Sequence, residues 1–271
     1  MADSTPRLIA LVTGASSGIG RGFASRLARD GHDLVLVARR RGALDALAAE
    51  LTLAHGVGVE VLDADLATDG GVAAVEQRLA SGDIELLVNN AGFGTSGEFA
   101  ELPLDRELRQ VDLNVRALVR LSHAALKPMY ARRHGAVVNV ASTGGFQPVP
   151  YMATYAGTKA FVLHFSEALH EEAARHGVTV TCLCPGPVKT GFQDAAQLDV
   201  SRMPSLGWTS VDEVVGQALS AARRRRAIAI PGALNRVTAA SVGFMPRFLT
   251  RRIAGSMFRG ASARRDDPDA R

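Results

Sequence analysis

Three side chains in the middle of the chain could together move a proton: Ser142, Tyr155 and Lys159. Tyr155 and Lys159 are four residues apart, which places them on one face of a helix predicted over residues 151–169. A ketone that accepts a hydride develops negative charge on its oxygen, and a phenol beside it can donate a proton in the same transition state. Because a nearby ammonium group favours the ionised phenol, we expect Lys159 to lower the Tyr155 pKa from its free value of about 10.

Ser142 ends a predicted strand over residues 136–141, thirteen residues before Tyr155. In a parallel sheet the carboxyl ends of the strands face the ligand crevice, so the strand would deliver this serine beside the reacting oxygen. There its hydroxyl could hydrogen-bond that oxygen. A tyrosine and a lysine four apart arise by chance in many helices, and the serine makes the combination more specific.

A glycine-rich turn follows the first predicted strand and opens a helix that runs to about residue 30. Its glycines have the spacing G-x-x-x-G-x-G. Residues without Cβ let the backbone approach a pyrophosphate, whose charge the N–H groups at the helix N-terminus can meet. The residues predicted to hold a dinucleotide here are Gly14, Ser16, Ser17, Gly18, Ile19 and Gly20. A tight turn without a ligand is the alternative.

The second predicted strand, residues 33–38, is followed by three arginines and no acidic residue. An acid at this point would bind the ribose 2′-hydroxyl of NAD, whereas a guanidinium group can hold a 2′-phosphate by charge-assisted hydrogen bonds. The sequence therefore predicts a preference for NADP(H), with Arg39 as the main contact and Arg40 as a weaker one. Three exposed arginines at a helix start are the alternative.

Short β-branched and leucine runs alternate with alanine-rich helical segments, which is typical of a parallel sheet covered on both faces. The predicted strands span residues 8–13, 33–38, 58–62, 84–89, 136–141, 178–184 and 227–230. They predict an α/β protein, a single-domain Rossmann fold with a doubly wound, seven-stranded parallel sheet. We assign residues 1–232 to this catalytic domain, with a lid loop at about 186–210, and residues 233–271 to a basic, partly helical extension.

Taken in order, these motifs resemble the short-chain dehydrogenase/reductase family. The resemblance implies a catalytic tetrad of Asn114, Ser142, Tyr155 and Lys159. In this tetrad Asn114 holds a water molecule that replaces the proton donated by Tyr155. It implies an adenine contact at Asp65, support of the cofactor's sugar by Asn90, and a carboxamide site at Val188 and Thr190. Together with Tyr155 and Lys159, the implied cofactor-binding residues in these later motifs are Asp65, Leu66, Asn90, Ala91, Gly92, Pro185, Gly186, Val188 and Thr190.

Residues 148–151 and the basic tail resemble the branch of the family that contains ketoacyl reductases and broad-specificity reductases. The expected pocket walls carry little fixed charge, which favours an apolar or acyl-type carbonyl, a 3-oxoacyl thioester included. They include Phe146, Val149, Phe192, Leu198, Met203 and Trp208. Two alternatives stay open: an NADP-dependent alcohol dehydrogenase working in the oxidative direction, and a non-enzymatic NADP(H)-binding regulator. The intact Ser142, Tyr155 and Lys159 argue against the regulator.

The net charge of +4 is unevenly distributed along the chain. Residues 223–271 hold twelve of the 31 basic residues and three of the 27 acidic ones. Such a tail could lie peripherally on an anionic membrane, close over the substrate, or contact another subunit of a homodimer or homotetramer. It has no recognisable nucleic-acid-binding motif, so a nucleic-acid partner is not expected.

Only two cysteines occur, Cys182 and Cys184, two apart in a predicted strand. They would face the same way, and buried packing is favoured over a disulfide. A reducing, cytoplasmic location follows, with peripheral membrane association as the alternative. No signal peptide or bilayer-spanning stretch is visible at either end or between. The histidines lack metal-ligand spacing, so no metal site is expected.

Overall fold

A seven-stranded parallel sheet runs through the protein, in the order β3-β2-β1-β4-β5-β6-β7. The computed structural model describes residues 7–192, 196 and 207–259. The strands are β1 Ile9–Thr13, β2 Asp33–Ala38, β3 Val59–Asp63, β4 Ile84–Asn89, β5 Ala136–Val140, β6 Thr179–Leu183 and β7 Ile228–Ala229. All seven predicted strands are present, with ends shifted by no more than two residues, and the doubly wound Rossmann fold is confirmed. The order reverses between β1 and β4, which is where such sheets bind their ligands.

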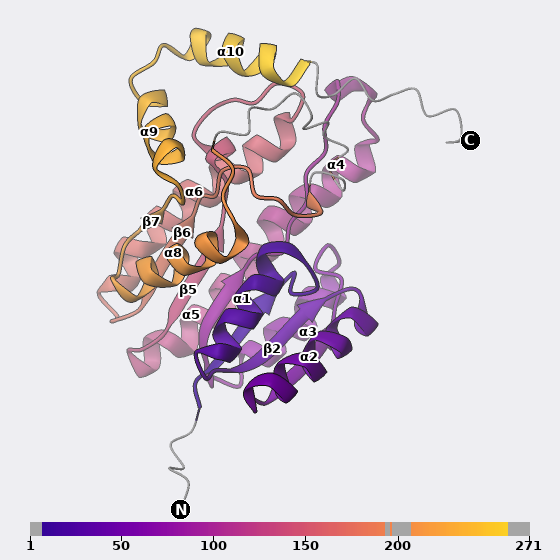
Figure 1. The fold of residues 1–271 in the computed structure, drawn as a ribbon, viewed down its shortest axis with the longest axis vertical. Coiled ribbons are helices and arrows are strands. Elements are labelled where there is room, and N and C mark those ends of the chain that lie inside the picture. Colours follow the sequence, from indigo (N-terminus) through magenta and orange to yellow (C-terminus); the bar gives the residue numbers. More distant parts are fainter. Residues whose placement is uncertain (1–6, 193–195, 197–206, 260–271) are drawn as a thin grey trace, which may run out of the picture.

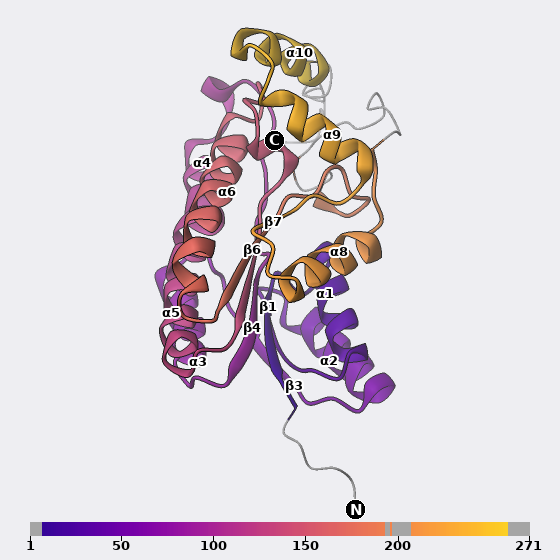
Figure 2. The same cartoon turned by 90° about the vertical axis from the view of Figure 1, so that its left-hand side faces the viewer.

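Helices cover both faces of this sheet (Figures 1 and 2). One layer contains α1 Gly18–Arg29, α2 Arg41–His55 and α8 Val211–Arg223. The other contains α3 Asp69–Leu79, α4 Leu104–Val111, α5 Leu118–Arg132 and α6 Ala153–Ala174. Each layer has its own apolar core: Phe23 and Leu44 pack on one face of the sheet, and Val75 and Leu121 on the other. The central strands are buried on both sides, so their sequences are continuous apolar runs.

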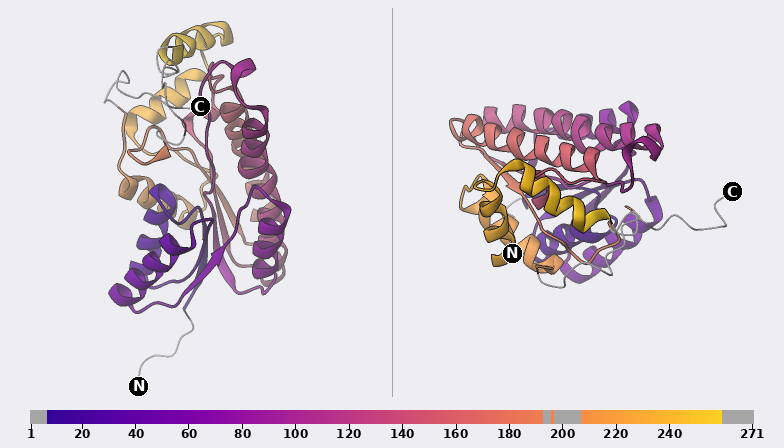
Figure 3. Two further views of the ribbon diagram at one scale, coloured as in Figure 1. Left: turned by 90° about the vertical axis from the view of Figure 1, so that its right-hand side faces the viewer. Right: turned by 90° about the horizontal axis from the view of Figure 1, so that it is seen from above.

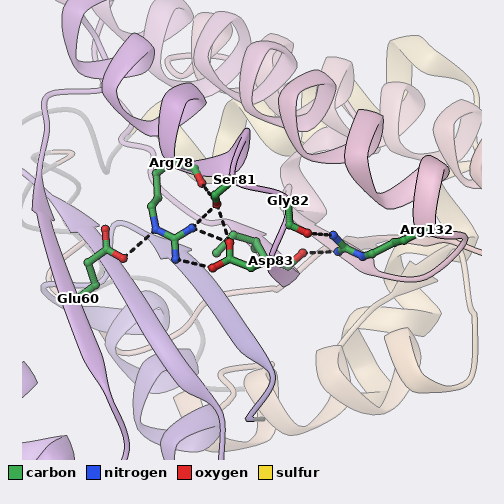
Figure 4. Close-up of polar contacts among 7 residues, drawn as sticks. Glu60, Arg78, Ser81, Gly82, Asp83 and Arg132 are labelled. Atoms are coloured by element: carbon green, nitrogen blue, oxygen red, sulfur yellow. Dashed lines mark hydrogen bonds and ion pairs between the residues drawn. The ribbon is translucent and has the colours of Figure 1, made fainter.

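The amino end of the sheet is held by an arginine-centred network (Figure 4). Arg78 of α3 donates to Glu60 at 2.7 Å and to Asp83 at 2.7 Å, and this hydrogen bonding lowers the pKa of Asp83. Arg132 at the end of α5 donates to the main-chain oxygens of Gly82 and Ile84. These contacts fasten the turn that leads into β4. They lie at the end of the sheet opposite to the residues expected to do chemistry.

Two further helices, α9 Ala233–Val242 and α10 Arg247–Arg259, follow β7. They lie beyond the carboxyl end of the sheet, and α10 crosses it when seen from above (Figure 3). Large apolar side chains of this region face solvent: Val237 of α9 is 66% exposed, and Phe244, between the two helices, is 93% exposed. The expected roles of this extension, at a membrane, at a subunit contact or over the substrate, stay predictions.

Cys182 and Cys184 are free, and both are completely buried, with their sulfur atoms 3.6 Å apart. The prediction of packing rather than a disulfide is confirmed. Within the described residues, no helix is long and apolar enough to cross a membrane. The same part of the chain contains no group of histidine, cysteine and acidic side chains that could hold a metal ion.

Candidate active site

The carboxyl ends of β4 and β5 meet the first turns of α6, and this junction brings Ser142, Tyr155 and Lys159 together. Ser142 follows β5 in an extended conformation, and its Oγ accepts a hydrogen bond from the Gly144 N–H at 3.1 Å. Hydrogen bonding between Ser142 and Tyr155 contributes to the Tyr155 pKa. The Lys159 Nζ lies 5.8 Å from the centre of the Tyr155 ring. The three predicted proton-handling residues therefore share one site.

Burial raises the pKa of Tyr155 to about 12, and the hydrogen bond with Ser142 only partly offsets this. The expectation that Lys159 would lower the Tyr155 pKa is therefore not what the structure shows. Desolvation disfavours the charged phenolate, and it outweighs an ammonium group that is itself bound elsewhere. At neutral pH Tyr155 is a protonated phenol, the form that an acid needs.

Lys159 is 5% exposed and donates a hydrogen bond from Nζ to the Val140 main-chain oxygen at 2.8 Å. Burial lowers its pKa to about 8. Removing a cation from water disfavours it, and the nearby Cys182 and Cys184 offset this only in part. Lys159 thus changes protonation close to physiological pH.

Asn114 lies in a π-helical turn, Asp112–Ala117, and is 1% exposed. Its amide bridges two elements. Oδ1 accepts from the Phe93 N–H at 3.1 Å, and Nδ2 donates to the Phe93 oxygen at 2.9 Å and to the Thr158 Oγ1 at 3.1 Å. The side chain therefore positions the segment after β4 against α6. That Asn114 also holds a water molecule for proton transfer stays a prediction. Thr158, which the sequence reasoning missed, is part of this arrangement.

The glycine turn has the shape that a pyrophosphate needs. Gly14 and Gly18 have φ angles of +65° and +55°, which side-chain-bearing residues rarely adopt. A Cβ on Gly20 would lie 2.2 Å from the Gly14 oxygen. Ser17 precedes α1 without a capping hydrogen bond from its side chain, so the first N–H groups of the helix are left to a ligand. These observations fit the dinucleotide that the sequence predicts.

Thr13 and Asn90 support this turn from below. The Thr13 Oγ1 accepts hydrogen bonds from the N–H groups of Asn90 at 2.9 Å and Ala91 at 3.0 Å. The Asn90 side chain donates in return to the Thr13 main-chain oxygen at 2.9 Å. The amide of Asn90 thus shapes the turn, and its expected support of the cofactor's sugar stays a prediction.

Gly92 leaves open the space above Lys159. A Cβ at Gly92 would lie 2.9 Å from the Asn114 Oδ1 and 3.5 Å from the Lys159 Nζ. A side chain here would therefore displace the amide that positions α6. The predicted glycine is required by this close approach.

The residues expected at the adenosine end differ in their surroundings. Arg39 is exposed and forms no ion pair or hydrogen bond with the described part of the chain, whereas Arg40 donates to the Ser16 Oγ at 3.2 Å. Asp65 forms an ion pair with Arg109 at 3.0 Å. Leu66 is buried nearby. Arg39 is thus the unpaired guanidinium group of the two, and its contact with a 2′-phosphate stays a prediction.

The segment after β6 reaches the glycine turn. The Pro185 oxygen accepts from the Thr143 N–H at 2.9 Å, and a Cβ on Gly18 would touch Thr190 at 3.4 Å. Val188 pairs with Thr209, which brings the two ends of the expected lid loop together. Within that loop, the predicted pocket residues Leu198 and Met203 lie outside the described residues.

Asn235 of α9 was not singled out from the sequence. It is 8% exposed and donates hydrogen bonds to the oxygens of Gly207 at 3.0 Å and Pro231 at 2.9 Å. A Cβ on Gly186 would lie 2.4 Å from its Nδ2. This contact attaches the extension to the segment after β6, and no local sequence signal reveals it.

A cavity of about 850 Å³ lies between α10 and the loops 97–102 and 150–153, and we call it the α10 cavity. Its lining includes Phe99, Pro150 and Tyr151, from segments expected at the pocket. It also includes Glu98, Arg251 and Arg252, which contradicts the expectation of little fixed charge.

The other expected pocket residues have different surroundings. Phe146 packs into a core cluster with Val162 and Cys182. The Phe192 ring lies 5.3 Å from the Tyr155 ring. None of the residues named for the pocket that the structure describes lines the α10 cavity, although neighbouring residues such as Phe99 and Pro150 do.

Comparisons with known proteins agree with this geometry. A family model for short chain dehydrogenases matches residues 8–200. A solved short-chain dehydrogenase from Sphingobium yanoikuyae in complex with NADPH is 41% identical, with a TM-score of 0.79, and the match covers 88% of this chain and 94% of that one. The bulky-bulky ketone specific alcohol dehydrogenase from Comamonas testosteroni is 36% identical, with a TM-score of 0.76, and the match covers 89% and 94%.

Curated relatives match over a shorter part of their own length. The very-long-chain 3-oxoacyl-CoA reductase of Pyrenophora tritici-repentis (strain Pt-1C-BFP) is 38% identical over 180 residues, which cover 64% of this chain and 53% of the relative. The chain thus spans about half the length of the first curated relatives it matches.

Proposed function

Because the chain belongs to the short-chain dehydrogenase family of oxidoreductases, we propose that it uses NADP(H) to interconvert a carbonyl and an alcohol by hydride transfer. The observation that carries the proposal is the junction of Ser142, Tyr155 and Lys159 beside the glycine turn. A protein that only binds the cofactor has no need of this acid-base set. We also propose that residues 1–232 form the catalytic domain.

Each residue of the site has a separate task in the proposed reaction. When bound, NADPH supplies the hydride that reduces the carbonyl carbon. Tyr155 donates the proton to the carbonyl oxygen as charge develops there, and Ser142 holds that oxygen by a hydrogen bond. Lys159 holds the nicotinamide ribose, and its hydrogen bond to the Val140 oxygen fixes α6 against β5. Asn114 holds α6 against the segment after β4 through its hydrogen bonds to Phe93 and Thr158.

The raised Tyr155 pKa supports the role of this residue as the acid in the reduction. A phenol with a pKa of about 12 is protonated throughout the physiological range and is ready to donate a proton. The same groups also catalyse the reverse reaction, so oxidation of an alcohol stays the alternative direction.

The preference for NADP(H) is supported at the end of β2. Arg39 has no acidic neighbour in sequence and no ion pair in the described structure, so its guanidinium group can bind a 2′-phosphate. The 41% identical relative from Sphingobium yanoikuyae is in complex with NADPH.

For the substrate we favour an elongated 3-oxoacyl thioester. The α10 cavity has room beside the catalytic helix for a long molecule, with apolar side chains such as Phe99 and Phe248 in its walls. Curated relatives carry the name very-long-chain 3-oxoacyl-CoA reductase.

The test is a screen of NADPH oxidation over aliphatic, aromatic, steroid and 3-oxoacyl thioester carbonyls, with NADH in parallel. We expect turnover with NADPH, and the highest kcat/KM with a 3-oxoacyl thioester. Tight NADPH binding without turnover of any carbonyl would contradict the proposal and support a regulator.

A further inference from the structure

The α10 cavity has one wall from the extension and one from the catalytic domain. A single face of α10 forms the first wall, because its lining residues recur at helical spacing. They are Phe248, Arg251, Arg252, Gly255 and Ser256. A Cβ on Gly255 would be only 3.5 Å from Pro150, so the helix packs closely against the opposite loop. The cavity is therefore a solvent-open groove with walls from two parts of the fold.

The catalytic-domain wall of the α10 cavity includes the first residue of α6, the helix that carries Tyr155. Ala153 is the first residue of α6 and lines the cavity, and Tyr155 lies two residues further on. The Gly97 N–H donates to the Tyr151 oxygen at 2.9 Å and joins the two loops of this wall. Tyr151 itself has a φ of +67°, a conformation that is costly for a side-chain-bearing residue. The α10 cavity therefore borders the start of the catalytic helix, although Tyr155 itself does not line it.

The charges in the cavity favour an anion. Arg251 and Arg252 form no ion pair with any residue that the structure describes, and neither does Glu98 across from them. Two guanidinium groups against one carboxylate leave a net positive wall. Guanidinium groups bind phosphate oxygens through paired, charge-assisted hydrogen bonds. The neighbouring Phe99, Leu102 and Phe248 can pack against the methylene and amide groups of a linear chain.

We propose that the α10 cavity binds the phosphate-bearing carrier arm of a thioester substrate, with Arg251 and Arg252 contacting its phosphate groups. The proposal rests on the proposed function, because it assigns a place to the half of the thioester that does not react. The acyl end would then lie at Ser142 and Tyr155. Glu98 would weaken phosphate binding and so limit the affinity for the released carrier.

The first experiment compares two thioesters of the same 3-oxoacyl group: one of coenzyme A, and one of N-acetylcysteamine, which has no phosphate. The double variant Arg251→Gln, Arg252→Gln should raise KM for the coenzyme A ester by about tenfold or more, as expected for lost hydrogen bonds between charged groups. KM for the N-acetylcysteamine ester and the Kd for NADPH should be unchanged. Equal increases for both esters would overturn the proposal.

Two matched variants sharpen the result. Arg247→Gln removes a charge from the same helix but from outside the cavity, and KM should stay the same for both esters. Glu98→Gln removes the opposing charge and should lower KM for the coenzyme A ester only. An effect of Arg247→Gln as large as that of the double variant would show that overall charge, and not the cavity, is responsible.

A binding measurement separates this proposal from the proposed function. Calorimetric titration with coenzyme A, at saturating NADP⁺ so that the dinucleotide site is filled, should show binding to the unaltered protein and at least about tenfold weaker binding to the double variant. This holds whether or not any carbonyl is reduced. No binding, or equal binding to both proteins, would refute the assignment of the cavity even if the protein reduces other carbonyls.

Discussion

The Nζ of Lys159 donates a hydrogen bond to the main-chain oxygen of Val140, 2.8 Å away. Val140 is the last residue of β5, and Ser142 follows it after one residue. One hydrogen bond therefore ties the helix that carries Tyr155 to the strand that presents Ser142. In this structure Lys159 positions the site as well as carrying its charge.

Replacing Tyr155 by Phe removes the proposed proton donor and leaves the ring. We expect kcat to fall by about 10²- to 10⁴-fold, the usual contribution of a positioned acid. The Kd for NADPH, measured by fluorescence titration, should change little. Substantial remaining turnover would show that another group donates the proton.

Replacing Lys159 by Met should change how stability depends on pH. Burial holds the folded pKa at about 8, below the ordinary value of 10.5, so between these values the unfolded chain binds more protons than the folded one. The free energy of unfolding of the unaltered protein should therefore rise with pH across this window, by up to about 3 kcal/mol.

The Lys159→Met variant lacks this rise, so its stability relative to the unaltered protein should be greatest below about pH 8 and decline toward pH 10. Urea unfolding of both proteins at pH 7 and pH 10 measures the difference. A difference that does not change with pH would contradict the lowered pKa.

Replacing Arg39 by Ala should raise KM for NADPH by about ten- to a hundredfold, because a charge-assisted contact to the 2′-phosphate is lost. KM for NADH should be unaffected. Arg41→Ala is the matched control, since Arg41 is already paired with Asp45 at 2.9 Å and Asp63 at 3.2 Å. If NADPH and NADH are affected alike, Arg39 does not select the cofactor.

Replacing Gly20 by Ala should weaken NADPH binding and destabilise the fold by more than about 1 kcal/mol, because the new methyl group would meet the Gly14 oxygen. Gly42→Ala is the control: nothing lies within 4 Å of a Cβ there, and a gain of about 0.4–1 kcal/mol is expected. Thermal unfolding and NADPH titration of both variants test the pair. A Gly20→Ala protein with intact binding would refute the role of the turn.

The sequence was sufficient for the parts of the fold that depend on local pattern. Continuous apolar runs revealed the central strands, because a strand buried on both faces has few polar positions. The four-residue spacing of Tyr155 and Lys159 placed them on one helical face. Because ligands bind at the carboxyl ends of the strands in a parallel sheet, the position of Ser142 after its strand predicted that it lies near Tyr155 and Lys159.

Other features depend on packing between distant segments, which no local pattern records. The raised pKa of Tyr155 results from burial by several elements at once. Asn114 looks like an ordinary helical residue until the π-helical turn directs its amide toward Phe93 and Thr158. The charged wall of the α10 cavity depends on which face of α10 meets Pro150, and the basic character of the tail did not determine that orientation.

The two buried thiols of Cys182 and Cys184 can report local unfolding of the core without an added label site. They are the only cysteines in the chain, and neither has any exposed surface. The hydrogen bond with Cys182 and burial also raise the pKa of Cys184, which leaves little reactive thiolate in the folded state. A thiol reagent can therefore react only when the structure around β6 opens by local or global unfolding. The rate of thiol labelling thus measures how often the catalytic core opens.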